Sequence, residues 1–259
     1  MRALAAAALV VLSFPAAAGA TDYGGGTGAG ARVTLIGFRM ADDGSGSVTV
    51  KIAAGCGVAE ATRDVALAAD GTFAIDTVER DGRQRSEISL SGQMAGPVAG
   101  GSVRARVTFR RRGRVVERCD SGMRAWNARA AGAATTGAAG AFYGLTGQTA
   151  RPFPLVLSVG GSRVRAAVFG YRMRCRSESF ERENITPGGP IASDGTFALS
   201  EQFSRRWREG RERFRVRLEG RVSATGVSGT LSVSSVLRSP GGRVLDRCTT
   251  GRQTFAAVP

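Results

Sequence analysis

The feature that most constrains the fold is an internal duplication, because two copies of one sequence pattern are expected to form the same structural unit twice. The segment Asp70–Ala74 recurs as Asp194–Ala198, and Gly113–Gly122 recurs as Gly242–Gly251. Further matches keep the same order in both halves: Ile88–Gly92 with Val216–Gly220, Trp126 with Phe255, and Tyr23-Gly24 with Tyr143-Gly144. The sequence therefore predicts two tandem repeats of one fold.

The cysteines fall at matching places in the two repeats, at Cys56 and Cys119 in the first and at Cys175 and Cys248 in the second. Four cysteines allow three pairings. The duplication favours Cys56–Cys119 and Cys175–Cys248, because each repeat then carries its own bridge. No pair has the CxxC spacing of zinc ribbons or thioredoxin-like redox sites. We therefore predict one disulfide within each repeat.

Alternating apolar and charged residues indicate β-strands. From Arg213 to Leu218 each arginine is followed by an apolar residue, and neighbouring residues of a strand point to opposite faces. The segment Val103–Phe109 alternates in the same way. Other segments rich in β-branched and large apolar residues are also expected to be strands. These are Val33–Phe38, Val48–Ile52, Leu155–Val159, Val164–Met173 and Leu231–Leu237.

Asp-Gly and Gly-Gly pairs separate these segments at short intervals and favour hairpin turns. The pattern predicts an all-β fold in which each repeat is a β-sandwich or a curved meander. The single helix candidate, Gln202–Arg213, is interrupted by Gly210 and fits a strand and loop equally well. We expect a glycine-rich lead-in at 21–31, the first β repeat at 32–129, a small-residue linker at 130–141 and the second β repeat at 142–259.

The N-terminus has the pattern of an export signal. Arg2 precedes a short apolar run, Ala3–Phe14, and Ala18-Gly19-Ala20 has the small residues that signal peptidase requires. The run is too short to cross a bilayer of about 30 Å as a helix. We therefore predict a signal peptide at 1–20, a secreted or cell-wall-associated protein, and no transmembrane span after removal of the signal peptide.

These motifs together resemble a group of secreted tandem-repeat β proteins from high-GC Gram-positive bacteria. The group's repeat has a Gly-x-Thr-x-Gln stretch, a middle Cys, an Asp-Gly-x-Phe turn and a late Cys-x-x-Gly. The second repeat carries all four, at Gly144–Gln148, Cys175, Asp194–Phe197 and Cys248–Gly251, whereas the first repeat has Gly26–Ala29 without the glutamine. The resemblance implies a β fold and secretion, and it carries no known activity.

The composition argues against common hydrolases. The chain has no histidine, which removes the usual general base of Ser-His-Asp enzymes and the commonest zinc ligand. We therefore predict a protein that is not an enzyme and that needs no cofactor and no metal. A hydrolase using paired carboxylates is the alternative, since such pairs need only converge in space. The available candidates are Asp120, Glu178, Glu219 and Asp246.

The formal net charge of +15 favours anionic partners at low salt. The candidate ligand-binding residues are Arg211, Arg213, Arg215 and Arg217, with Trp207 as an exposed aromatic contact. A second arginine cluster spans Arg110–Arg114. The competing interpretation is a solvated strand face whose charge is damped by Glu201, Glu209 and Glu212. Few aromatic residues are available for base stacking, so specific nucleic-acid recognition is not expected.

Two further motifs favour structural roles. The repeated Asp-Gly-Thr-Phe sequence fits a hairpin turn with a core phenylalanine better than a calcium loop, which needs several ligands close together. Trp126 and Phe255, just past the late cysteines, fit the core better than a sugar-binding platform. The function expected from the sequence is a non-catalytic binding module for an anionic surface polymer. The alternative is a structural or adhesive protein that binds protein partners. The sequence leaves the oligomeric state open.

Overall fold

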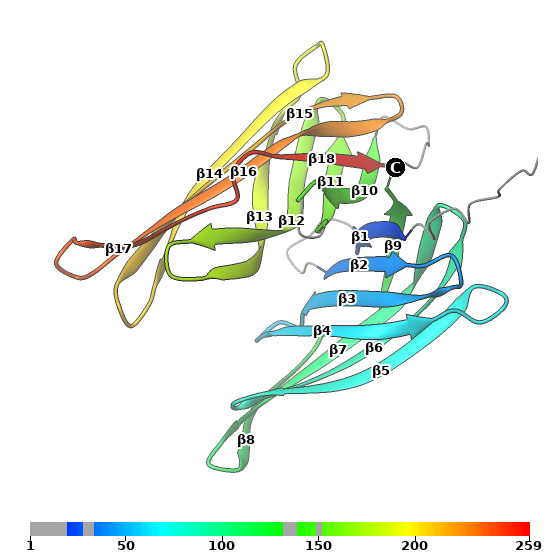
Figure 1. Ribbon diagram of the computed structural model, residues 1–259, viewed down its shortest axis with the longest axis horizontal. Coiled ribbons are helices and arrows are strands. Elements are labelled where there is room, and N and C mark those ends of the chain that lie inside the picture. Colours follow the sequence, from blue (N-terminus) through cyan, green and yellow to red (C-terminus); the bar gives the residue numbers. More distant parts are fainter. Residues whose placement is uncertain (1–19, 28–33, 132–138, 149–151) are drawn as a thin grey trace, which may run out of the picture.

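The computed structural model describes residues 20–27, 34–131, 139–148 and 152–259, and these residues form strands and turns without a helix (Figure 1). Eighteen strands form two antiparallel sheets, one for each repeat. The first sheet contains β1 (Thr21–Gly26), β2 (Thr34–Met40), β3 (Ser45–Ala53), β4 (Val58–Ala66), β5 (Thr72–Asp81), β6 (Gln84–Ala95), β7 (Val98–Arg111), β8 (Arg114–Asp120) and β9 (Arg124–Ala130). The second contains β10 (Gly140–Thr146), β11 (Pro154–Gly160), β12 (Arg163–Cys175), β13 (Ser179–Pro190), β14 (Thr196–Arg206), β15 (Arg211–Ser223), β16 (Gly226–Arg238), β17 (Val244–Thr249) and β18 (Gln253–Val258).

Each sheet is a curved meander in which the first and last strands pair with each other. The order is β4-β3-β2-β1-β9-β7-β6-β5 in the first sheet and β13-β12-β11-β10-β18-β16-β15-β14 in the second. β8 extends β7 as a projecting hairpin, and β17 forms a similar hairpin with β16 but also pairs with β12 (Figure 1). The identical order confirms the predicted class, two tandem all-β repeats.

Both predicted disulfides are present, Cys56–Cys119 and Cys175–Cys248. In the second repeat the bridge joins β12 to β17, whose residues also pair at this point. The predicted hairpin glycines adopt a positive φ, for example 79° at Gly71 and 85° at Gly195.

The pleat of the strands separates a buried inner face from an outer face. In the first repeat the core centres on Phe38, Phe73 and Trp126, whose rings lie 5.4–6.1 Å apart. In the second repeat Phe255 is buried at the place of Trp126, and Phe197 at the place of Phe73. The prediction that these residues belong to the core is therefore confirmed.

Strand register corrects one of the sequence matches. A β-carbon built on Gly25 would lie 2.0 Å from the carbonyl oxygen of Asn127, and one built on Gly144 would lie 1.9 Å from that of Ala256. Gly144 therefore corresponds to Gly25 and not to Gly24. The identity between the two Tyr-Gly pairs is misleading, because a one-residue shift moves every side chain to the other face. Tyr23 accordingly packs in the first core, whereas Tyr143 lies outside the second core.

Tyr143 instead helps to join the two repeats. It forms an apolar cluster with Leu35 of the first sheet and with two valines of the second sheet, Val156 and Val168. The Arg129 guanidinium lies 5.7 Å from the centre of the Tyr143 ring, and Arg129 Nε donates a hydrogen bond to the Pro259 carbonyl. The two sheets are therefore packed against each other through β1, β2 and β9 of the first and β10 and β11 of the second.

Three segments differ from the sequence predictions. The linker predicted at 130–141 overlaps strands at both ends, since Ala130 ends β9 and Gly140 begins β10, and residues 132–138 lie outside the described residues. Thr21–Gly26, predicted within a loose lead-in, forms β1 and pairs with both β2 and β9, because its glycines allow close approach of the neighbouring backbones. The helix candidate Gln202–Arg213 forms the end of β14, a turn at Gly210 and the start of β15. The predicted signal peptide lies almost wholly outside the described residues. Within the part of the chain that the structure describes, no helix is long and apolar enough to span a membrane.

Candidate functional site: a basic face on the second repeat

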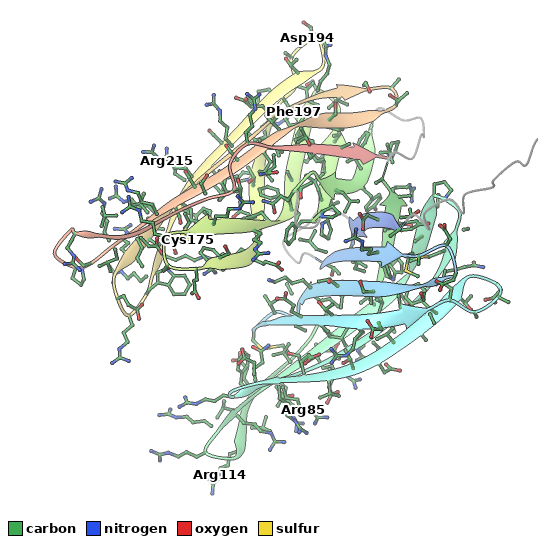
Figure 2. The ribbon with its side chains drawn as sticks, in the orientation of Figure 1. Arg85, Arg114, Cys175, Asp194, Phe197 and Arg215 are labelled. Atoms are coloured by element: carbon green, nitrogen blue, oxygen red, sulfur yellow. A yellow bond between two sulfur atoms is a disulfide. The ribbon has the colours of Figure 1, made fainter. Side chains whose placement is uncertain are left out.

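The arginines predicted to bind a ligand lie on the outer face of β15. Exposed and buried positions alternate along this strand, so every second side chain points away from the core. Figure 2 shows this for Arg215, whose side chain projects away from the ribbon. The pleat brings four arginines into one row: Arg211, Arg213, Arg215 and Arg217.

Neighbouring strands extend this row into a polar surface that we call the basic face. Strand pairing sets serines and a glutamine beside the row, and it adds arginines at one end. The basic face consists of the β15 row together with Ser200, Gln202, Ser204 and Arg206 on β14, Ser232, Ser234, Val236 and Arg238 on β16, and Arg247 and Thr249 on β17.

Two adjoining grooves cross the basic face. The larger has a volume of 620 Å³ and is lined by Arg211, Arg213, Arg215, Arg238 and Arg247 among other residues. The smaller has a volume of 450 Å³ and is lined by Arg215 and Arg217 together with serines of β14 and β16. Side chains that donate hydrogen bonds therefore line both grooves.

The charge of the basic face is poorly balanced by acids. Within the described residues, the row on β15 makes one recorded ion pair, from Arg217 Nε to Glu219 Oε1 at 2.8 Å. Arg211, Arg213 and Arg215 are exposed and have no recorded carboxylate partner. The face therefore presents several guanidinium groups that are available to an anion.

The expectation that neighbouring acids damp this charge is wrong for Glu201 and Glu212, because both point to the inner side of the sheet, whereas Glu209 is exposed in the turn between β14 and β15. Glu212 is only 5% exposed and accepts hydrogen bonds from Trp207 Nε1 at 2.8 Å and from Ser235 Oγ at 2.5 Å. Glu201 accepts a hydrogen bond from Asn184 Nδ2 at 3.1 Å. Adjacent positions on one strand thus separate the acids from the arginines.

Trp207 does not join the basic face. It lies in the turn between β14 and β15, and its indole donates to the inner carboxylate of Glu212. The Arg182 guanidinium lies 5.0 Å from the centre of its ring. Trp207 therefore contacts the inner side of the sheet, opposite the arginine row.

The equivalent face of the first repeat is neutralised by acids. Glu87 stands at the position of Arg215 and pairs with Arg85 at 3.0 Å. Asp120 stands at the position of Thr249 and binds Arg104 at 2.5 Å and Arg106 at 3.2 Å. One fold therefore carries a charge-paired face in the first repeat and an unpaired basic face in the second.

Asp120 offers a test of this pairing. Hydrogen bonds from the Arg104 guanidinium, the Gly122 N–H and Arg106 hold the pKa of the Asp120 carboxyl well below its usual value of about 4. A carboxyl whose pKa is lower in the folded state stabilises the fold above pH about 4, and this contribution is lost as the pH falls through the folded pKa.

As the pH falls from about 5 to about 2, we therefore expect the unfolding free energy of Asp120→Asn to fall less than that of the wild type, because asparagine does not titrate. Urea titrations of the wild type and the variant at both pH values would measure this. The same loss in both proteins would show that the pairing of Asp120 with Arg104 and Arg106 adds nothing to stability.

The candidate carboxylates lie in three separate places, and Glu178 is next in the chain to Ser177, which hydrogen-bonds to Asp246. Asp120 belongs to the first repeat, and Glu219 pairs with Arg217 on the basic face. Asp246 accepts hydrogen bonds from the Arg176 N–H and from Ser177 Oγ, beside the second disulfide. The structure gives no hydrogen bond or ion pair that joins these carboxylates to one another.

The repeated Asp-Gly-Thr-Phe turns are stabilised within themselves. Asp194 Oδ1 accepts hydrogen bonds from the Thr196 N–H at 3.0 Å and from Thr196 Oγ1 at 2.7 Å, and Asp70 does the same with Thr72. Figure 2 places Asp194 at the tip of its hairpin and Phe197 where β14 begins. The hairpin interpretation accounts for these residues.

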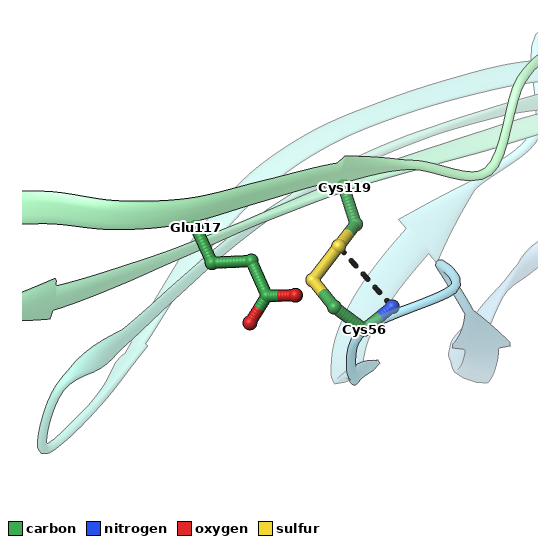
Figure 3. Close-up of side chains that lie close together, drawn as sticks. All are labelled: Cys56, Glu117 and Cys119. Atoms are coloured by element: carbon green, nitrogen blue, oxygen red, sulfur yellow. Dashed lines mark hydrogen bonds between the residues drawn. A yellow bond between two sulfur atoms is a disulfide. The ribbon is translucent and has the colours of Figure 1, made fainter.

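Possible metal ligands gather only beside the disulfides, among the residues that the structure describes. In Figure 3 the Glu117 carboxylate approaches the bridge between Cys56 and Cys119, and the Cys56 N–H donates to Cys119 Sγ at 3.1 Å. Metal binding by cysteine uses the thiolate. Sulfur atoms bonded to each other do not provide it.

Sequence patterns gave the β15 row, but they missed Arg238 and Arg247. Neither residue belongs to a run of alternating arginines. They lie beside the row only because β16 pairs with both β15 and β17. The predicted disulfide gave no signal for Arg247, because it sets the neighbouring Cys248 against β12 and not against β15.

Comparison with known proteins adds little to this description. No protein-family model and no curated protein matches the chain. Kievitone hydratase from Nectria haematococca is 5% identical, with a TM-score of 0.20 over 93% of this chain and 89% of that chain. A Nitrosomonas europaea protein provisionally assigned as an AttH is 8% identical, with a TM-score of 0.22 over 92% and 91% of the two chains.

Both TM-scores are too low to support an argument about fold or activity. The resemblance to secreted tandem-repeat proteins therefore stays a prediction. Fold and surface together define a duplicated, disulfide-containing all-β protein with a basic face on its second repeat.

Proposed function

We propose that this protein is a non-catalytic, secreted or cell-wall-associated module that binds an anionic surface polymer through the basic face. The observation that carries the proposal is the contrast between the repeats. At equivalent positions the first repeat pairs its arginines with Glu87 and Asp120, whereas the second has Arg215 and Thr249. The second repeat therefore lacks, at these positions, the acids that would compete with an anionic ligand.

The geometry of a strand suits a ligand with repeated charges. Alternate residues on a strand lie about 7 Å apart, so the row from Arg211 to Arg217 presents guanidinium groups at regular intervals. A guanidinium binds a phosphate or carboxylate through two parallel hydrogen bonds. Serine and glutamine side chains beside the row can donate to the oxygens of a sugar or polyol between the charged groups.

The location proposed for the protein rests on two features. The sequence predicts a signal peptide at residues 1–20. Each repeat contains a disulfide, which is typical of proteins outside the cytosol.

Replacing Arg211, Arg213, Arg215 and Arg217 by serine is expected to weaken polymer binding by about 10- to 100-fold at about 0.1 M salt, because each exposed ionic contact contributes up to about 1 kcal/mol. Retention on immobilised polyphosphate and on bacterial cell walls would measure the effect, with neutral dextran as the blank. Wild-type retention should disappear between about 0.1 and 1 M salt, over which the Debye length falls from about 10 to 3 Å.

A matched control removes the same positive charge elsewhere, by replacing Arg110, Arg111, Arg112 and Arg114 with serine. This control should keep wild-type retention, whereas equal losses in both variants would show that net charge alone drives binding. Retention of the wild type in about 1 M salt would favour the adhesive alternative, in which the ligand is a protein.

A further inference from the structure

A second surface stands apart from the basic face, at the hairpin between β7 and β8 of the first repeat. This hairpin projects from the end of the sheet, with Arg114 near its tip (Figures 1 and 2). Every residue from 110 to 118 is exposed, and β8 pairs with β7 alone. Neither face of the hairpin is therefore covered by the rest of the described protein.

The exposed hairpin carries apolar side chains as well as charge. Val115 is 37% exposed and Val116 is 60% exposed, and Val116 lies at an irregularity in the pairing of β7 with β8. Val115 and Val116 therefore add exposed apolar side chains to a strongly charged hairpin.

The charge of the hairpin is strongly positive. From residue 110 to 118 the sequence holds Arg110, Arg111, Arg112, Arg114 and Arg118 against a single acid, Glu117. In the second repeat the equivalent turn reads Ser239-Pro240-Gly241-Gly242, so the three consecutive arginines belong to the first repeat only.

The turn of the hairpin places an arginine at its tip. Arg111 pairs with Arg114, so Arg112 and Gly113 form a two-residue turn, and their φ values of 50° and 79° are those that a tight hairpin turn needs. Glycine or asparagine is favoured in this left-handed region, and Arg112 is the one non-glycine residue of the described chain with a positive φ.

We propose that this hairpin docks onto the surface of an anionic lipid bilayer. The valines would enter the interface between headgroups and acyl chains, and the arginines would reach lipid phosphates with their long side chains. A bilayer interface surrounds an inserted hairpin on both faces, and all residues from 110 to 118 are exposed and open to such contact. A polyanion in water would satisfy the arginines and leave the valines exposed.

The test uses the chain from Thr21 to Pro259, which contains all eighteen strands and both cores, so that the apolar N-terminal run does not contribute. Binding is measured by co-sedimentation with vesicles of phosphatidylglycerol and phosphatidylcholine, and with phosphatidylcholine alone. We expect binding to the anionic vesicles only. Val115→Ser with Val116→Ser should reduce it about tenfold, and replacing Arg110, Arg111, Arg112 and Arg114 by serine about a hundredfold.

Matched controls separate this hypothesis from the proposed function. Val78→Ser with Val98→Ser changes two exposed valines elsewhere in the first repeat, 47% and 37% exposed, and should bind vesicles like the wild type. The basic-face variant, with serine at 211, 213, 215 and 217, should also keep vesicle binding while it loses polymer retention.

A direct probe of insertion is Val116→Trp, whose fluorescence should shift to shorter wavelengths on anionic vesicles. Absence of wild-type binding to anionic vesicles, equal binding to neutral vesicles, or wild-type binding by the Val115/Val116 variant would each overturn the proposal. Competition by soluble polyphosphate with no wavelength shift would show that the hairpin binds polyanions in water instead.

Discussion

Replacing Trp126 by alanine is expected to lower the unfolding free energy of the first repeat by about 3–5 kcal/mol, the usual cost of removing a large buried aromatic side chain. The indole is 1% exposed and contacts the rings of Phe38 and Phe73. Its Nε1 donates to the Ser91 carbonyl at 3.1 Å. The substitution therefore leaves a cavity and an unsatisfied acceptor together.

The measurement is a urea titration followed by circular dichroism, with the fluorescence of Trp207 as a reporter of the second repeat. The first repeat should unfold at lower urea, while the Trp207 transition moves little. Trp126→Phe is the matched control and should cost roughly 1–2 kcal/mol, because phenylalanine already occupies this place in the second repeat at Phe255. Equal stability of Trp126→Ala and the wild type would contradict the assigned core.

Loss of the second disulfide is expected to be about as costly. Cys175 and Cys248 are separated by 73 residues, and closing a loop of that length stabilises the folded state by about 4 kcal/mol on the chain-entropy model. The bridge ties β12 to β17, the strand that places Arg247 on the basic face. Replacing both cysteines by serine should therefore reduce polymer retention as well as stability.

The duplicated bridge provides the control for this experiment. Replacing Cys56 and Cys119 by serine opens a loop of 63 residues in the first repeat, and its cost should also be about 4 kcal/mol. Polymer retention should persist in that variant below its unfolding transition. Loss of retention in both cysteine variants would mean that the repeats fail together, and the basic face would then need another test.

The features that sequence predicts best here are those set within one strand or by the duplication. Alternation between Arg213 and Leu218 gave the arginine row because side-chain direction in a strand depends only on position. The matching positions of the cysteines predicted both disulfides, because two copies of one fold are expected to contain the same bridge. The Asp-Gly turns followed from the conformational freedom of glycine.

The features that sequence missed depend on how separate strands pair. Glu201 and Glu212 lie close to the arginines along the chain, but the pleat turns them inward. Arg238 and Arg247 lie far from the row along the chain, and the pairing of β16 with β15 and β17 places them beside it. Tyr143 was matched to Tyr23 by residue identity, although a shift of one residue places it between the repeats.

The packing of β1 against β10 makes position 24 decisive for how the two repeats fit together. A β-carbon built on Gly24 would lie 2.1 Å from the Gly144 carbonyl oxygen and 2.6 Å from Leu145 Cδ2, so a larger residue at this position would displace the second repeat. The close approach of the two repeats therefore depends on the missing side chain of one residue.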